Sequence, residues 1–428
     1  MSRARSARRA RRRAALAASL AVSVVLLGAC GVAPGSPVTT ASHVVGPPGL
    51  AWTTASQVQR PEGMSAEPPA EPPVATHGGG LGHPGHFSGQ GNPFDVVRID
   101  DRLVAPGYTY PDFHAVTWTS TDRELWSLAE LPPGRTAAFG LAIAAGSGRH
   151  VIVGRIGNDA AAWSSPDGVT WQPADGGAAF VEAPETRMTA VVSTPSGFVG
   201  GGWAGITNQP GSARFWTSPD GRSWERIADG PAFADGRVAS IVKTADGLVA
   251  VGATGPVGHA TGSAVWRSTD GSTWARVAGS AALSAGSIAG VTAGGTGPDG
   301  AVGLVAVGAS LDSTKAMVWL SADGLTWRLA PDQDSLTYHG LKITMADVTS
   351  GPDGTLVAVG HFLFGTQYGQ GTAWTSTDGS SWTRAEDLAV FGQGEPGAVI
   401  ADGAGYVAVG TVGAPDNYVP TVWLSPGG

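Results

Sequence analysis

Short apolar runs that end in glycine recur along this chain of 428 residues. Residues 248–252 read LVAVG, and closely similar runs occupy residues 304–308, 356–360 and 406–410. In each unit a small-residue run and a glycine turn precede this segment, and two further short segments follow it. Runs of this length, bounded by glycine and polar turn residues, are typical of β-strands. The pattern therefore predicts four short strands per unit, with no long amphipathic helix between the units.

Pairs of tryptophan residues mark the turn between the last two strands of each unit. In the clearest copy, Trp374 and Trp382 flank the sequence TSTDGSS, and in all six complete copies the two tryptophans are eight residues apart. We expect a hairpin about the Asp-Gly centre, with the tryptophans opposite each other and the carboxylate accepting hydrogen bonds from the turn backbone. A requirement that repeats six times is structural rather than catalytic. This structural role is assigned to Asp122, Asp167, Asp220, Asp270, Asp323 and Asp378.

The spacing of these copies predicts the architecture. Successive first tryptophans are 45, 53, 50, 53, 55 and 49 residues apart, and Trp423 is the seventh. Four-stranded units of this length are typical of β-propeller blades, so seven blades are predicted. The seventh copy stops at Gly428, before its second tryptophan, whereas residues 49–55 read like the missing second half. We therefore predict that the N-terminal segment completes the last blade, with Trp52 packed beside Trp423, and so closes the ring.

The motif S-x-D-G-x-x-W in these copies resembles the Asp-box, or BNR repeat, and the chain resembles the Asp-box β-propellers. That group includes sialidases, sortilin-type receptors and photosystem II assembly factors. The resemblance implies an all-β propeller, to which the repeat count assigns seven four-stranded antiparallel blades. It leaves the activity open, because this fold hosts enzymes and binding proteins alike.

The N-terminal residues 1–29 have the features of a lipoprotein signal peptide. Seven arginines precede an apolar segment at residues 16–27, which is shorter than a membrane-spanning helix requires. The sequence Leu-Gly-Ala-Cys that ends at Cys30 resembles a bacterial lipobox, so this single cysteine is the predicted site of acylation. The alternative is an ordinary secretory signal with an incidental cysteine. The remaining assignments are a flexible tether at 30–48 and the propeller at 49–428, made of a closing strand (49–59), a flexible insertion (60–93) and the blades (94–428).

Removal of the signal makes the chain strongly acidic. Seven of the 26 basic side chains lie before residue 30, which leaves 19 against 34 acidic side chains and a formal net charge of −15. Such a charge argues against nucleic acid and anionic membrane surfaces as partners. We expect an extracytoplasmic monomer that is held at the cell membrane only by the lipid on Cys30 and has no cofactor.

One position varies from blade to blade although the motifs around it are constant. It directly follows the glycine of the second strand, and in one blade it holds the only tryptophan outside the two repeating columns. We expect these positions at one rim of the ring, at the start of loops opposite the Asp-box turns, where a ligand could contact them. The alternative is that exposed loop starts are simply unconstrained. The predicted ligand-binding residues are Tyr108, Arg155, Trp203 and His361.

The insertion contains three histidines among glycines, His77, His83 and His86. Their spacing matches no standard metal site, so a flexible histidine-containing loop is preferred and no metal is predicted.

Two functions remain open. A sialidase needs an arginine triad, a tyrosine nucleophile with a carboxylate partner, and an acidic proton donor. Only residues 97–100, VRID, resemble its arginine-containing first-blade motif, without the proline of that motif, and sialidase propellers have six blades. We therefore favour a cell-surface lipoprotein whose non-catalytic propeller binds or scaffolds a protein or glycan partner, and we assign no catalytic residue. The alternative is a sialidase-like or other glycoside hydrolase with its site in the central mouth of the propeller.

Overall fold

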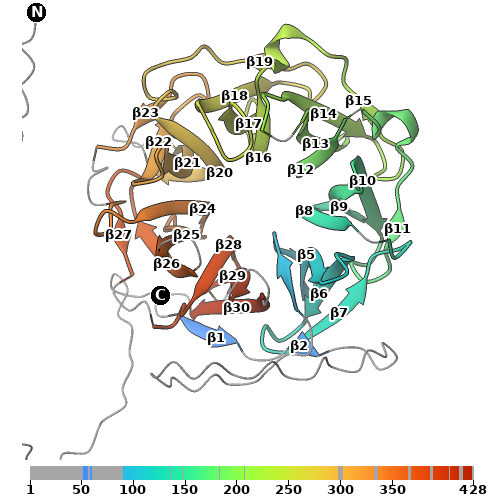
Figure 1. The fold of residues 1–428 in the computed structure, drawn as a ribbon, viewed down its shortest axis with the longest axis horizontal. Helices are drawn as coiled ribbons and strands as arrows, with labels where there is room; N and C mark the ends of the chain where they lie inside the picture. Colours follow the sequence, from blue (N-terminus) through green and yellow to red (C-terminus); the bar gives the residue numbers. More distant parts are fainter. Residues whose placement is uncertain are drawn as a thin grey trace, which may run out of the picture. The chain divides into compact units, whose positions relative to one another are not determined.

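The computed structural model describes residues 52–55, 58–59 and 90–426, apart from residues 136, 147, 183, 207, 297–301, 332–335, 365–367, 386–388, 404 and 414–417. Within this part of the chain seven sheets lie around a common axis as the blades of a propeller (Figure 1). No α-helix occurs there, and short 3₁₀ turns include η1 (Gly177–Ala179) and η2 (Pro231–Phe233). The predicted all-β, seven-bladed propeller is confirmed. The signal, the whole tether with Cys30, and the three histidines of the insertion lie outside the described residues.

Blades 2 to 6 each consist of four consecutive antiparallel strands, which follow one another outward from the axis. Blade 2 contains β8 (Ala138–Gly146), β9 (Arg149–Ile156), β10 (Asp159–Ser165) and β11 (Gln172–Pro173). Blade 3 contains β12 (Thr186–Thr194), β13 (Gly197–Ala204), β14 (Ser212–Ser218) and β15 (Glu225–Arg226). Blade 4 contains β16 (Arg237–Thr244), β17 (Gly247–Thr254), β18 (Gly262–Ser268) and β19 (Ala275–Arg276). Blade 5 contains β20 (Gly286–Thr296), β21 (Val302–Ser310), β22 (Ala316–Ser321) and β23 (Arg328–Leu329). Blade 6 contains β24 (Lys342–Ser350), β25 (Leu356–Phe364), β26 (Tyr368–Ser376) and β27 (Thr383–Arg384).

Blade 7 is completed by the N-terminal segment. Its first three strands are β28 (Gly394–Ala401), β29 (Gly405–Val412) and β30 (Val419–Pro426), and β1 (Thr53–Ala55) pairs antiparallel with β30. Thr54 lies opposite Trp423, as Arg384 lies opposite Trp374 in blade 6. Trp52 therefore takes the place of a second Asp-box tryptophan, and it is buried in the same core cluster as Trp423. The predicted closure of the ring is confirmed, residue by residue.

Blade 1 departs from the common pattern at both of its edges. It contains β5 (Arg102–Tyr110), β6 (Ala115–Ser120) and β7 (Trp126–Glu130), and its inner strand is broken into β3 (Gln90–Pro93) and β4 (Val97–Ile99). Strand β3 lies within the segment assigned to the insertion, because β5 continues past its glycine and pairs with β3. At the outer edge β2 (Val58–Gln59) pairs parallel to β7. The N-terminal segment therefore contacts both blades that meet at the ring closure (Figure 1).

The Asp-box turns have the expected carboxylate geometry. In blade 4, Oδ1 of Asp270 accepts hydrogen bonds from the backbone N–H groups of Ser272 and Thr273, both at 2.8 Å, and Oγ of Ser268 accepts one from Gly271 N at 2.8 Å. These backbone hydrogen bonds, first that of Thr273, hold the pKa of Asp270 below its usual range. The other five complete copies repeat the pattern, so the structural role of these aspartates is supported by their hydrogen bonds.

The two tryptophans of a copy, however, do not lie opposite each other. Trp266 pairs with Arg276, two residues beyond Trp274, and the same offset recurs in the other copies. The carboxylate holds the two residues before the second tryptophan in the turn, so in blades 2 to 6 the fourth strand begins only after this tryptophan. The indole N–H of Trp274 instead donates to the carbonyl oxygen of Gly271 at 3.1 Å. The first tryptophans are fully buried in the apolar clusters through which neighbouring blades pack.

Candidate binding site on the rim

The four predicted ligand-binding residues lie within strands, so the expectation that they begin exposed loops is wrong. Strands β5, β9, β13 and β25 each continue beyond the glycine, because the inner strand of the same blade supplies a pairing partner at this level. Trp203 is only 4% exposed, and the other three are partly buried. The register partners of the four residues are Asn92, Phe139, Arg187 and Thr344.

Aromatic rings join blades 1 and 2 at this rim. The ring of Tyr108 stacks on that of Phe113, with centroids 5.6 Å apart, and lies 5.0 Å from that of Phe139 in blade 2. The carbonyl oxygen of Phe113 accepts a hydrogen bond from Ala138 N at 2.8 Å, which fastens the loop of blade 1 to the first strand of blade 2. Phe113 is 36% exposed, so this aromatic group presents a face to solvent.

A guanidinium group covers the aromatic ring of blade 2. Arg155 lies over Phe139 at 4.2 Å from the ring centroid, and its Nη1 donates to the carbonyl oxygen of Gly157 at 2.6 Å. Burial lowers the pKa of Arg155, and the nearby positive charge of Arg187 lowers it further. The negative charge of Glu185 acts in the opposite direction and raises the pKa of Arg155. The cation is therefore held in place beside a second cation and one carboxylate.

Blade 3 repeats this arrangement with the two residue types exchanged. Arg187, from the inner strand, lies over the ring of Trp203 at 4.8 Å and forms an ion pair with Glu185. Its Nε atom is buried and has no hydrogen-bond partner among the described residues. The backbone N–H of Gly205 donates to the carbonyl oxygen of Glu185 at 3.0 Å, which fixes the start of the following loop. The next residue of that loop, Ile206, is 47% exposed.

These side chains form one continuous group across three blades, which we call the rim cluster. It contains three of the four predicted ligand-binding residues and three residues outside that set. Two of these, Phe139 and Arg187, lie on inner strands, where β-sheet register places them opposite Arg155 and Trp203. The third, Phe113, lies in the loop that follows β5 of blade 1. The rim cluster comprises Tyr108, Phe113, Phe139, Arg155, Arg187 and Trp203.

His361 is not part of the rim cluster. It lies in β25 of blade 6, where burial lowers its pKa, and the charge of Glu395 in blade 7 acts in the opposite direction. Its Nδ1 atom is buried and finds no hydrogen-bond partner in the described part of the chain. The structure therefore separates this predicted ligand-binding residue from the other three.

Two partly buried carboxylates connect inner strands of neighbouring blades. Asp95 in blade 1 accepts a hydrogen bond from Ile143 N at 2.9 Å, and Asp347 in blade 6 accepts one from Val399 N at 2.9 Å. Both donors lie just after the β-bulge of the next blade. Burial raises the pKa of Asp95 to about 7, with a smaller contribution from Asp347, and raises that of Asp347 to about 6. Each carboxylate joins two blades, and each also has the raised pKa of a candidate general acid.

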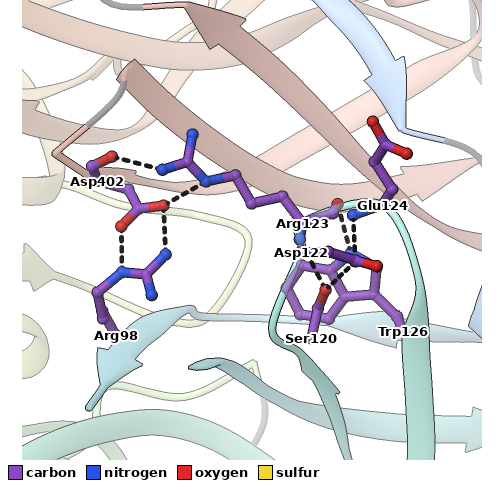
Figure 2. A network of polar contacts seen from close by, with 7 residues as sticks. All are labelled: Arg98, Ser120, Asp122, Arg123, Glu124, Trp126 and Asp402. Carbon is purple, nitrogen blue, oxygen red and sulfur yellow. Dashed lines mark hydrogen bonds and ion pairs between the residues drawn. The ribbon is translucent and has the colours of Figure 1, made fainter. Parts of the chain in front are cut away.

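A third polar group closes the seam between blades 7 and 1 (Figure 2). Arg98, from β4, binds both carboxylate oxygens of Asp402, which is itself buried. Arg123 contacts the same carboxylate from the first Asp-box turn, with Nε 2.8 Å from Oδ2, and donates from Nη2 to the carbonyl oxygen of Asp402 at 2.9 Å. Arg123 takes the place of the Asp-box glycine and keeps its positive φ of 72°. Arg98, the arginine of the VRID sequence, is thus engaged in ring closure, whereas a sialidase would need the arginine of this motif to bind its substrate.

The described part of the chain shows no cluster of three or more histidine, cysteine, aspartate or glutamate side chains arranged to hold a metal ion. A search of the same residues for a helix long and apolar enough to cross a membrane finds none.

Comparison with known proteins finds relatives in structure only. No protein-family model matches the sequence, and no curated protein matches it. The fold is similar to a Trypanosoma rangeli sialidase in complex with 2,3-difluorosialic acid, at 11% identity and a TM-score of 0.43, over 77% of this chain and 53% of that one. It is also similar to a protein of unknown function from Dyadobacter fermentans, at 11% identity and a TM-score of 0.43, over 79% and 95% of the two chains. A third neighbour is an α-L-arabinanase from Penicillium chrysogenum, at 13% identity and a TM-score of 0.41, over 79% and 93%.

These neighbours include glycoside hydrolases, the class named as the alternative in the sequence analysis. This chain spans about half the length of the sialidase it matches, 53%. Structural similarity at 11–13% sequence identity extends to the fold and not to the residues of an active site.

Proposed function

We propose that this protein is an extracytoplasmic binding module, anchored through a lipid on Cys30, and that its partner docks on the rim cluster. The observation that supports this proposal is the convergence of aromatic and arginine side chains from three blades, which provides the residue types that dominate binding energy at interfaces. The strongly acidic composition supports a partner other than nucleic acid. The proposal includes a monomer, and it is supported by the closing strand, which completes blade 7 within the same chain.

Chemical cross-linking on whole cells, followed by affinity purification and mass spectrometry, tests this proposal. The partner should be recovered with the parent protein and lost with Arg155→Gln, because that change removes a cation of the rim cluster and leaves the fold in place. The matched control is Arg222→Gln, which changes an exposed arginine on an Asp-box turn. Equal recovery of the partner with Arg155→Gln would contradict docking at the rim.

The second candidate is a glycoside hydrolase. The raised pKa of Asp95, about 7, supports it, because a carboxyl group that stays protonated near neutral pH can act as a general acid. The hydrogen bonds of Asp95 and Asp347 to the next blades instead give both carboxylates a structural role. Assays on sialyl, galactosyl and arabinosyl substrates decide between the candidates. Turnover that is abolished in Asp95→Ala, with the fold intact by circular dichroism, would establish the hydrolase and refute the non-catalytic module.

A further inference from the structure

We propose that the rim cluster recognises an acidic segment of a protein partner. A partner carboxylate binds Arg155 and Arg187, and apolar side chains beside it cover Phe113 and Ile206. This inference rests on the proposed function and names the chemistry of its partner.

The charges of the rim cluster call for an anion. Arg155 and Arg187 are close enough for one to lower the pKa of the other. Among the described residues, Glu185 forms an ion pair with Arg187, and its negative charge also acts on Arg155, so one carboxylate faces two guanidinium groups. An incoming carboxylate would offset the excess positive charge and accept charge-assisted hydrogen bonds, which are the strong ones.

Both guanidinium groups are already held in place. Arg155 is fixed between the ring of Phe139 and the carbonyl oxygen of Gly157, and Arg187 lies on the ring of Trp203. A planar fork that is fixed before binding loses little conformational freedom when it takes up a carboxylate. The net charge of −15 that is expected after removal of the signal does not prevent this, because at physiological salt the charges more than about 8 Å away are largely screened.

The surroundings of the arginine pair favour a protein over an acidic glycan. The loops on either side expose Phe113 by 36% and Ile206 by 47%. Covering such groups releases water from apolar surface, which aliphatic and aromatic side chains of a peptide do and hydroxyl-rich sugar rings do less well. Tyrosine, tryptophan and arginine are also the residue types enriched at the energetic centres of protein interfaces. The site therefore fits a carboxylate flanked by apolar side chains.

Fluorescence anisotropy with two synthetic peptides tests the inference. One labelled peptide has two glutamates between two leucines, and the other has glutamines in their place. The glutamate peptide should bind the parent protein, and the glutamine peptide should bind about tenfold or more weakly, as expected for the loss of hydrogen bonds to charged groups. Arg155→Gln and Arg187→Gln should each lower the affinity for the glutamate peptide by a similar factor, whereas Arg222→Gln should leave this affinity unchanged.

Glu185→Gln separates recognition from folding. It removes the carboxylate that competes within the chain for Arg187, so the glutamate peptide should bind this variant severalfold more tightly than the parent protein. Weakening in this variant, equal binding of both peptides, or no saturable binding would each overturn the inference. Arginine-dependent binding of polygalacturonate without binding of the peptide would assign the site to an acidic glycan instead. If the peptide fails while cell-surface cross-linking still captures a partner through Arg155, the inference is wrong and the proposed function stands. If neither the peptide binds nor the cross-linking captures a partner through Arg155, both the inference and the proposed function are wrong.

Discussion

Truncation of Trp52 should open the propeller. The side chain is buried in the cluster that contains Trp423, so Trp52→Ala leaves a cavity, and such changes cost about 3–5 kcal/mol. In the described part of the chain, strand β1 pairs with β30 through three residues, and without its tryptophan we expect it to detach. Loss of these backbone hydrogen bonds adds roughly 1–3 kcal/mol. The total is a large share of the 5–15 kcal/mol by which a typical domain is stable.

The matched control is Trp382→Ala, which removes the equivalent side chain from blade 6. Its cavity should cost a similar amount, but the strand after it stays in a blade whose four strands are consecutive in the chain. Urea unfolding followed by circular dichroism should therefore show a lower midpoint for Trp52→Ala than for Trp382→Ala. Light scattering should show association of Trp52→Ala alone, because its β30 exposes an unpaired edge. An unchanged urea midpoint and a monomeric Trp52→Ala would refute closure by the N-terminal strand.

Four further substitutions test other parts of the account. Asp402→Ala leaves two guanidinium groups without their shared carboxylate and should lower the free energy of unfolding by about 1–3 kcal/mol. This is less than the loss expected for a fully buried ion pair, because both arginines are partly exposed. Urea denaturation measures the change in unfolding free energy. Added Arg123→Gly should restore part of this loss, because glycine accepts the positive φ and one unpaired cation is removed; no recovery would contradict the role of Arg123 at the seam. His150 is 6% exposed and lies opposite the Asp-box serine, a position that leucine fills in four other blades. His150→Leu should therefore stabilise the protein by about 1–2 kcal/mol in thermal denaturation, and an equal or lower melting temperature would argue against it. Burial lowers the pKa of His150 below its unfolded value, so the parent should lose stability as pH falls from 7 to 5 and the variant should lose less. Cys30→Ser should release the protein from the membrane fraction in a fractionation blot, and unchanged partitioning would exclude the lipid anchor.

The blades were predictable because the hydrogen bonds of the Asp-box form between residues that are close in the sequence. Its carboxylate, serine and glycine act within a few residues, and its spacing repeats along the chain, so both the number of blades and the split seventh copy follow from sequence. The relation between Trp266 and Trp274 did not follow, because the length of the turn depends on which N–H groups the Asp270 carboxylate binds. Register of this kind is a property of the folded hairpin.

The rim was only partly predictable for a related reason. Tyr108 and Arg155 were predicted because each directly follows the glycine of the second strand. Their neighbours Phe139 and Arg187 come from inner strands, in which a β-bulge shifts the pairing register by one residue. The depth of a side chain is also invisible in the sequence. Trp203 is nearly fully buried, so its truncation should cost stability as well as binding, and Arg155 is the better probe of recognition. Asp402 stands in no motif and is placed only by the closure of the ring.

Site-specific photo-cross-linking on the cell surface tests docking at the rim most directly. A photoreactive amino acid is placed at Phe113 or at Ile206, which flank the arginine pair, or at Leu325, an exposed residue of an Asp-box turn. The account predicts one and the same protein cross-linked from both rim positions, lost when Arg155→Gln is added, and no such product from Leu325. The same product from Leu325, or its persistence in the Arg155→Gln background, would contradict the assignment of the rim cluster as the binding surface.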